Sequence, residues 1–215
     1  MKTLTREMRD ALTPAMAIEV LRKGNERFLN NLKANRNLLQ QVNETSEGQH
    51  PCAIVLSCID SRTSAELIFD QGLGDIFSCR IAGNVLNEDI LGSMEFACRV
   101  AGAKVVVVLG HTRCGAVKGA CDGVELGNLT ALLQKIRPAV QLEAQEHPLL
   151  ETTDQTFVER VARRNVLRVK QQILEQSPVL TSMIENSEIA LLGGMYDVDT
   201  GAVEFYDTLM LLGTR

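Results

Sequence analysis

The segment Lys104-Val-Val-Val-Val-Leu109 contains an uninterrupted run of β-branched residues that ends in a leucine. Such a run is typical of a central parallel strand covered on both faces. A shorter apolar run at Ala53–Ser57 predicts a second buried strand, and residues 75–81 predict a third. Helical patterns alternate with these strands. The sequence therefore predicts an α/β fold with a mainly parallel central sheet flanked by helices.

The remaining elements are expected around this sheet. Residues 13–32 have apolar side chains at helical spacing and predict an amphipathic N-terminal helix outside the main sheet, whereas the polar stretch 35–50 predicts a loop. Residues 189–195 and 202–206 predict a C-terminal hairpin at the sheet edge, with its turn at Asp199-Thr-Gly201. Further helices are expected at 64–69, 90–101, from about 114, and at 129–146, 156–175 and 179–185.

Length and composition fit a globular protein of one domain. The chain has 215 residues, of which 45% are hydrophobic and 23% charged. We interpret 1–215 as a single domain, with a helical arm over 1–34 and an α/β core over 50–210. A net charge of −5 argues against a nucleic-acid partner. Neither a signal peptide nor a membrane span is recognisable, which predicts a cytoplasmic protein that binds no membrane.

Six cysteines in such a chain predict reduced thiols rather than a disulfide framework. Free cysteines in apolar segments behave as small buried hydrophobic residues. Four of the six fit this interpretation: Cys52, Cys79, Cys98 and Cys121.

The other two cysteines belong to motifs at strand ends. Cys58-Ile-Asp60-Ser-Arg62 follows one predicted strand, and His111-Thr-Arg-Cys114 follows the valine run after Gly110. Because the carboxyl ends of parallel strands meet at one edge of a sheet, both motifs should converge. Cys114 then begins a helix, whose free N–H groups favour a thiolate. Two sulfurs and one imidazole leave a tetrahedral zinc site one ligand short, as catalytic zinc sites are.

Asp60 and Arg62 are expected to form an ion pair beside this site. Their two-residue spacing lets both side chains leave one face of an extended segment, so a bidentate contact is feasible. An arginine in this position would hold the aspartate ionised. The carboxylate can then accept a hydrogen bond from a metal-activated water, or it can occupy the fourth metal position itself.

The two motifs and their surroundings resemble those of β-class carbonic anhydrases. The likeness extends over about 17–207 and includes three supporting segments: Asp70-Gln-Gly-Leu-Gly-Asp75, Arg80-Ile-Ala-Gly-Asn84 and Met195-Tyr-Asp-Val-Asp-Thr-Gly201. The resemblance implies that Cys58, His111 and Cys114 hold one Zn²⁺ per chain within the 50–210 core. It also implies that Asp60 and Arg62 form the catalytic dyad, with Asp60 a conditional metal ligand.

The resemblance further implies a substrate pocket formed by Gln49, Phe77 and Phe96. Plant-like members carry a glutamine nine positions before the first zinc cysteine, where this chain has Gln49, and Phe77 matches their pocket phenylalanine. Phe96 takes the place of a tyrosine. A second branch of the family has a tryptophan where this chain has Val55, so Arg80 lacks its partner for that branch's inhibitory bicarbonate site. The sequence favours the plant-like branch.

The implied activity is the reversible hydration of carbon dioxide to bicarbonate and a proton. Two thiolates neutralise the charge of Zn²⁺, so activity is expected to rise with pH into the alkaline range. The resemblance implies that Gln49 and Phe77 reach the zinc of a neighbouring subunit. The minimal active unit is therefore expected to be a homodimer, or a homotetramer built from it, with the N-terminal helix wrapping the partner.

Three alternatives stand beside this interpretation. The same site can hydrolyse a related linear substrate, carbonyl sulfide or carbon disulfide. A non-catalytic structural zinc module would have Asp60 permanently on the metal. A thiol-dependent enzyme would use Cys58 or Cys114 as its nucleophile, although the paired acid–base group is then an aspartate held by arginine rather than a histidine.

Overall fold

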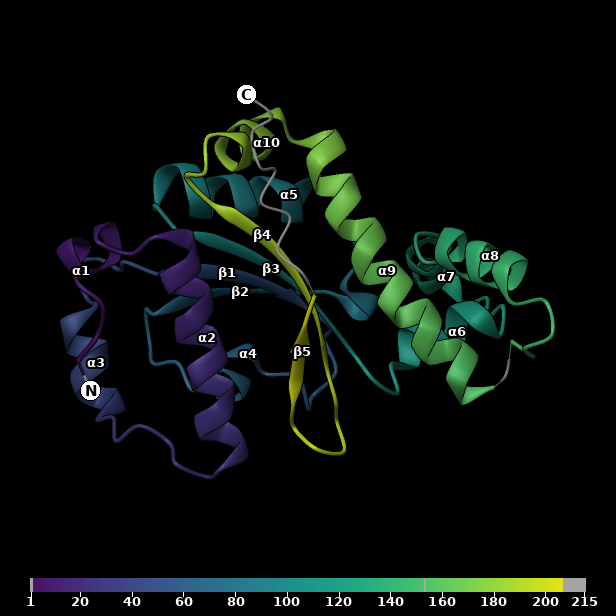
Figure 1. Cartoon of the computed structure of the whole chain (residues 1–215), viewed down its shortest axis with the longest axis horizontal. Helices are drawn as coiled ribbons and strands as arrows, with labels where there is room; N and C mark the ends of the chain where they lie inside the picture. The colour runs from purple at the N-terminus through teal and green to yellow at the C-terminus, as the bar shows by residue number, and fades with distance from the viewer. Residues whose placement is uncertain (1, 153, 207–215) are drawn as a thin grey trace.

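The computed structural model describes residues 2–152 and 154–206 and builds them around one five-stranded sheet (Figure 1). The strand order is β2-β1-β3-β4-β5; the first four of these strands are parallel to one another, and β5 is antiparallel to β4. This confirms the predicted α/β fold with a mainly parallel sheet. The strands are β1 (Ala53–Ser57), β2 (Ile76–Arg80), β3 (Val105–His111), β4 (Ala190–Tyr196) and β5 (Val203–Phe205).

The central strand β3 sends alternate side chains into two separate apolar layers. Val106 and Val108 belong to one buried cluster, while Val105 and Val107 belong to the other. This is the period of two that a strand covered on both faces requires. The first cluster lies under six helices: α5 (Glu88–Glu95), α6 (Gly115–Cys121), α7 (Gly127–Gln134), α8 (Arg137–Glu146), α9 (Gln155–Gln176) and α10 (Pro178–Glu185).

Helix α2 (Pro14–Leu29) covers the second face of the sheet, together with α4 (Ala65–Ile68). Its residues Ala17 and Leu21 are fully buried in the cluster that contains Val107. The predicted amphipathic helix is therefore present outside the sheet, but its apolar face packs on the sheet of its own chain and is not free to wrap a partner subunit. An amphipathic helix needs an apolar surface to cover, and the sheet of its own chain supplies one.

The stretch 35–50, predicted as a loop, contains the helix α3 (Leu38–Glu44). Its first turn is capped by Asn37, whose side-chain oxygen accepts from the Gln40 N–H at 3.0 Å. The Gln41 side chain is buried and accepts from the N–H of Leu73 at 3.3 Å. Tertiary contacts thus stabilise a helix that the local pattern does not indicate. A further short helix, α1 (Arg6–Asp10), precedes α2.

Other boundaries also differ from the expectation. The helix predicted over 129–146 is two helices, α7 and α8, because the chain breaks its helical course before Pro138. The helix predicted over 90–101 ends in a π-helical turn at Phe96–Val100. The last four residues of the predicted core, 207–210, lie outside the described residues. None of the described helices is both long and apolar enough to span a membrane.

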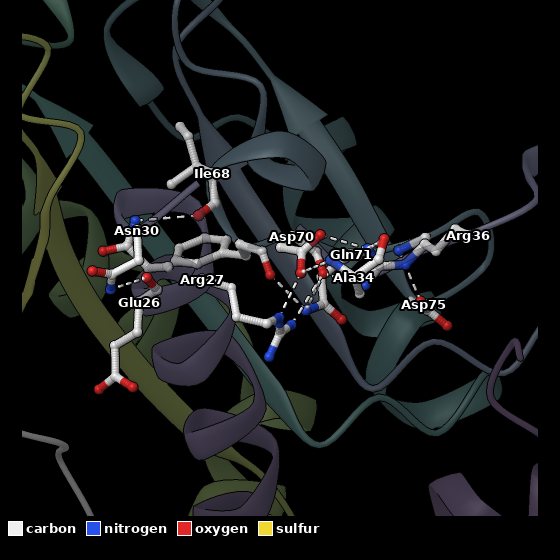
Figure 2. A network of polar contacts seen from close by, with 12 residues as sticks. Glu26, Arg27, Asn30, Ala34, Arg36, Ile68, Asp70, Gln71 and Asp75 are labelled. Carbon is white, nitrogen blue, oxygen red and sulfur yellow. Dashed lines mark hydrogen bonds and ion pairs between the residues drawn. The ribbon is translucent and has the colours of Figure 1, made fainter. Parts of the chain in front are cut away.

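The connection between α2 and α3 is fastened by the buried carboxylate of Asp70 (Figure 2). Its oxygens accept from Arg27 Nε at 2.5 Å, from the backbone N–H of Ala34 at 3.1 Å, and from the guanidinium of Arg36. Burial acts to raise the pKa of Asp70, but these donors outweigh it and the pKa is lowered. Asp70 therefore holds both α2 and the segment between α2 and α3 onto the turn that follows α4.

Candidate metal centre

Cys58, His111 and Cys114 meet at the carboxyl end of the parallel sheet. Cys58 directly follows β1, His111 is the last residue of β3, and Cys114 is the N-cap of α6. One ligand atom from each side chain lies within 4.8 Å of the other two, and all three residues are buried. The two motifs, far apart in sequence, converge as the strand order predicts.

The imidazole of His111 has one ring nitrogen engaged and the other free. Nδ1 lies 2.8 Å from the carbonyl oxygen of Thr112, which can only accept, so Nδ1 carries the proton. Nε2 is then the ring nitrogen that keeps an available lone pair. Within the described part of the chain this buried Nε2 has no hydrogen-bond partner, which is rare for a buried polar atom. A metal ion would provide the missing partner.

The two sulfurs form a closely coupled pair, with Sγ atoms 3.9 Å apart. A hydrogen bond from the Cys114 thiol lowers the pKa of Cys58 to about 4. The resulting Cys58 thiolate, followed by burial, raises the pKa of Cys114 far above its ordinary value. The pair therefore shares one proton at neutral pH, because two thiolates so close repel each other. A divalent cation removes that obstacle and allows both to ionise.

This donor set fits zinc. Two thiolate sulfurs and one neutral imidazole nitrogen are ligands that Zn²⁺ prefers, and three protein ligands leave one tetrahedral position for a water or substrate. The cysteines interpreted as packing residues differ from this pair. Burial raises the pKa of Cys52 and of Cys98 to about 12, so both stay as inert thiols.

Asp60 and Arg62 form the predicted bidentate pair at the rim of the centre. Arg62 Nε donates to Asp60 Oδ1 at 2.9 Å and Nη2 donates to Oδ2 at 2.8 Å, while the Arg62 backbone N–H adds a third bond at 3.0 Å. These contacts, the Arg62 side chain first, hold the pKa of Asp60 well below its usual range. Asp60 is thus an ionised hydrogen-bond acceptor, and it is not a member of the three-residue group that can hold a metal.

The backbone that carries Cys58 and Asp60 is held by two residues to which the sequence analysis gave no such role. Arg80 Nε donates to the carbonyl of Cys58 at 3.0 Å, and Arg80 Nη2 donates to that of Asp60 at 2.6 Å. The Thr63 hydroxyl donates toward the same two carbonyls, at 3.0 and 2.9 Å. Arg80 lies opposite Ser57 in the β1–β2 register, so only the strand pairing reveals it.

The expected pocket residues gather at a different place. Gln49, Phe77 and Phe96 line one open surface groove, and the two rings meet edge-on with centroids 6.2 Å apart. Phe77 pairs with Ile54 on β1, four positions before Cys58 and thus about 13 Å away along the strand. The structure therefore brings these three residues together but does not place them at the metal group of their own chain.

Comparisons with known proteins agree with this site. A family model described as carbonic anhydrase matches residues 53–203. Carbonic anhydrase 2 of Mycobacterium tuberculosis is 32% identical over 208 residues, which cover 93% of this chain and 96% of that protein. A carbonic anhydrase of Mycolicibacterium smegmatis is 30% identical over 207 residues, covering 93% and 97%.

Solved structures carry the same fold. The β-carbonic anhydrase CafA of Aspergillus fumigatus superposes with a TM-score of 0.71 at 31% identity, over 79% of this chain and 81% of that chain. The β-carbonic anhydrase CcaA gives a TM-score of 0.71 at 28% identity, over 88% and 93%. With its motifs, sheet order and convergent Cys-His-Cys group, the chain belongs to the β-class carbonic anhydrases, a family of lyases.

Proposed function

We propose that this protein catalyses the reversible hydration of carbon dioxide with one Zn²⁺ per chain, held by Cys58, His111 and Cys114. The observation that carries the proposal is the cluster of three buried residues whose ligand atoms lie within 4.8 Å of one another, and in which His111 Nε2 has no hydrogen-bond partner among the described residues. Bound zinc would lower the pKa of a coordinated water, so that a nucleophile exists near neutral pH.

Asp60 orients that nucleophile in this proposal. An ionised carboxylate accepts but cannot donate a hydrogen bond, so Asp60 selects a proton-bearing oxygen and turns its lone pair toward the substrate carbon. Arg62 is a positioning residue, because its three donors leave the carboxylate little freedom to turn. Because these contacts hold Asp60 on Arg62, we expect the fourth metal position to stay open rather than to be occupied by Asp60.

We propose that Gln49, Phe77 and Phe96 complete the pocket of a neighbouring subunit. An amide N–H of Gln49 can donate to a substrate oxygen, and the two rings form an apolar wall suited to a small uncharged molecule. Support comes from their position: all three line a surface groove, and Phe96 is 54% exposed in the single chain. A large exposed apolar ring next to other apolar side chains is typical of an interface.

The assembly proposed is a homodimer or a homotetramer. Two β-carbonic anhydrases of Sordaria macrospora are described as tetrameric, and one of these structures shares the fold at a TM-score of 0.71 and 23% identity. A cytoplasmic location stays a prediction from the sequence.

A stopped-flow assay of carbon dioxide hydration tests the proposed function. Zinc-loaded protein should hydrate carbon dioxide, lose this activity on chelation and regain it when zinc returns. Parallel assays with carbonyl sulfide and carbon disulfide separate the nearest alternative, which predicts faster turnover of those substrates. Activity that survives full removal of zinc would instead support the thiol-dependent enzyme.

A further inference from the structure

Asn165 is a buried amide on α9 that reaches the turn beside the metal ligands. Asn165 is 2% exposed, and its Nδ2 donates to the carbonyl oxygen of Gly83 at 2.9 Å. The two residues are 82 positions apart in sequence. A buried hydrogen bond of this kind fixes the position of the carbonyl that accepts it.

Gly83 in turn contacts the first metal ligand. Its backbone N–H donates to the Sγ of Cys58 at 3.3 Å, inside the buried end of the sheet. Gly83 has a φ of +66°, and a Cβ atom there would lie 2.6 Å from Cδ1 of Ile136. The turn therefore requires glycine, for its backbone conformation and for lack of space.

A glycine is also the residue that rotates most freely, so its N–H direction depends on anchors elsewhere. The carbonyl of Gly83 is held by Asn165 on one side, and its N–H points to sulfur on the other. Without the first contact, the turn Ala82–Asn84 can relax and the N–H can leave the sulfur. Hydrogen bonds to a ligating sulfur draw electron density from it and so tune the metal.

We propose that Asn165 is a positioning residue of the metal centre, which aims the Gly83 N–H at the Cys58 sulfur and thereby sets how strongly that thiolate donates to the metal. The inference rests on the proposed function only in requiring a divalent metal at this group. Asn165 touches neither substrate nor metal. Its effect passes through one backbone turn.

Cobalt substitution tests this directly, since Co²⁺ bound by thiolates shows sulfur-to-metal charge-transfer absorption. In Asn165→Leu, the sulfur loses its hydrogen bond and donates more readily, so the band moves to longer wavelength. Affinity for Co²⁺, measured by chelator competition, should nevertheless fall about 10–100-fold, because the turn no longer holds the Cys58 sulfur in position for the metal, as expected for the loss of an outer-shell partner. Both readouts are independent of turnover.

Asn25→Leu is the matched control. Asn25 is a buried asparagine on α2 whose Nδ2 also donates to backbone carbonyls, those of Ile68 at 3.2 Å and Gly201 at 3.0 Å. Its loss should lower thermal stability but leave the cobalt band in place. A purely structural role for Asn165 predicts the same pattern in both variants.

A shift of the charge-transfer band in Asn165→Leu alone supports the inference. An unmoved band in Asn165→Leu, or an equal shift in Asn25→Leu, overturns it. If Asn165→Leu does not fold, Asn165→Ala removes the same donor without a bulkier apolar group and is judged by the same criteria. Wild-type protein that takes up Co²⁺ without any thiolate charge-transfer band would refute the metal site itself.

Discussion

The sulfur atoms of Cys58 and Cys114 lie 3.9 Å apart at the buried end of the sheet, although 56 residues separate them in the chain. At this distance each negative charge opposes the other, so the metal-free pair retains a proton. Cys58 is the ionised member, with a pKa lowered to about 4 by the hydrogen bond from Cys114. The number of protons at the centre therefore depends on whether a metal is bound.

Zinc binding should release one proton from the thiol pair at neutral pH. Cys58 is already ionised there, whereas the raised pKa of Cys114 keeps its proton until a cation arrives. Zinc affinity should then rise about tenfold per pH unit between pH 7 and 8, because one proton competes with each metal ion. Calorimetry in buffers of different ionisation enthalpy measures the proton count. Release of two thiol protons would show that the pair is not coupled.

Asp60→Asn should reduce carbon dioxide hydration about 10–100-fold while zinc content and fold stay unchanged. The amide keeps the shape of the carboxylate but loses its charge, its bidentate pairing with Arg62, and one acceptor oxygen. Asp122→Asn is the control, since Asp122 forms an exposed pair with Lys118 at 2.6 Å, away from the three ligands. Full activity in Asp60→Asn would favour a different role for the dyad.

Mixing two inactive variants should restore activity if the pocket is shared between subunits. Cys58→Ser removes a ligand and Gln49→Ala removes a pocket donor, so each homodimer is impaired. After denaturation and co-refolding, half of the dimers carry both kinds of chain, and each of these has one intact site, giving about a quarter of wild-type activity by the symmetry of the dimer. A mixture no more active than its components would place Gln49 in the pocket of its own chain.

Asp70→Asn should lower the free energy of unfolding by about 3–5 kcal/mol at pH 7, because Arg27 and the buried Arg36 each lose one anionic contact. The pKa of Asp70 is lowered in the folded state, so its contribution is present above about pH 4 and is lost as the pH falls further. Urea unfolding at several pH values should show the wild-type advantage shrinking toward acid. Asp122→Asn should cost less than about 1 kcal/mol, and an equally small loss in Asp70→Asn would contradict the assigned network.

The sequence predicts well whatever depends on local pattern. The valine run at 105–108 identifies the central strand, and strands followed by ligand residues predict where Cys58 and His111 meet. The turn before β5 also matches, since Asp197 Oδ1 accepts from the N–H groups of Asp199 and Thr200. These features are set by residues close together in the chain, or by the general geometry of parallel sheets.

Features that depend on distant contacts are not predictable in this way. Helix α3 forms because Gln41 is buried against the turn at 72–73, which no local pattern shows. The amphipathic pattern of α2 shows that the helix covers an apolar surface, but it does not show whether that surface belongs to a partner or to the sheet of the same chain. The contacts of Arg80 with the Cys58 carbonyl and of Asn165 with Gly83 join strand, turn and helix across long sequence separations.

The most direct test measures zinc content and carbon dioxide hydration on the same samples of wild type and Cys58→Ser, with Cys121→Ser as control. Cys121 is a half-buried free thiol on α6, the helix that begins after Cys114. We expect one zinc per chain and rapid hydration in wild type and Cys121→Ser, and loss of both in Cys58→Ser. Undiminished hydration by Cys58→Ser, with or without zinc, would contradict the proposed metal centre.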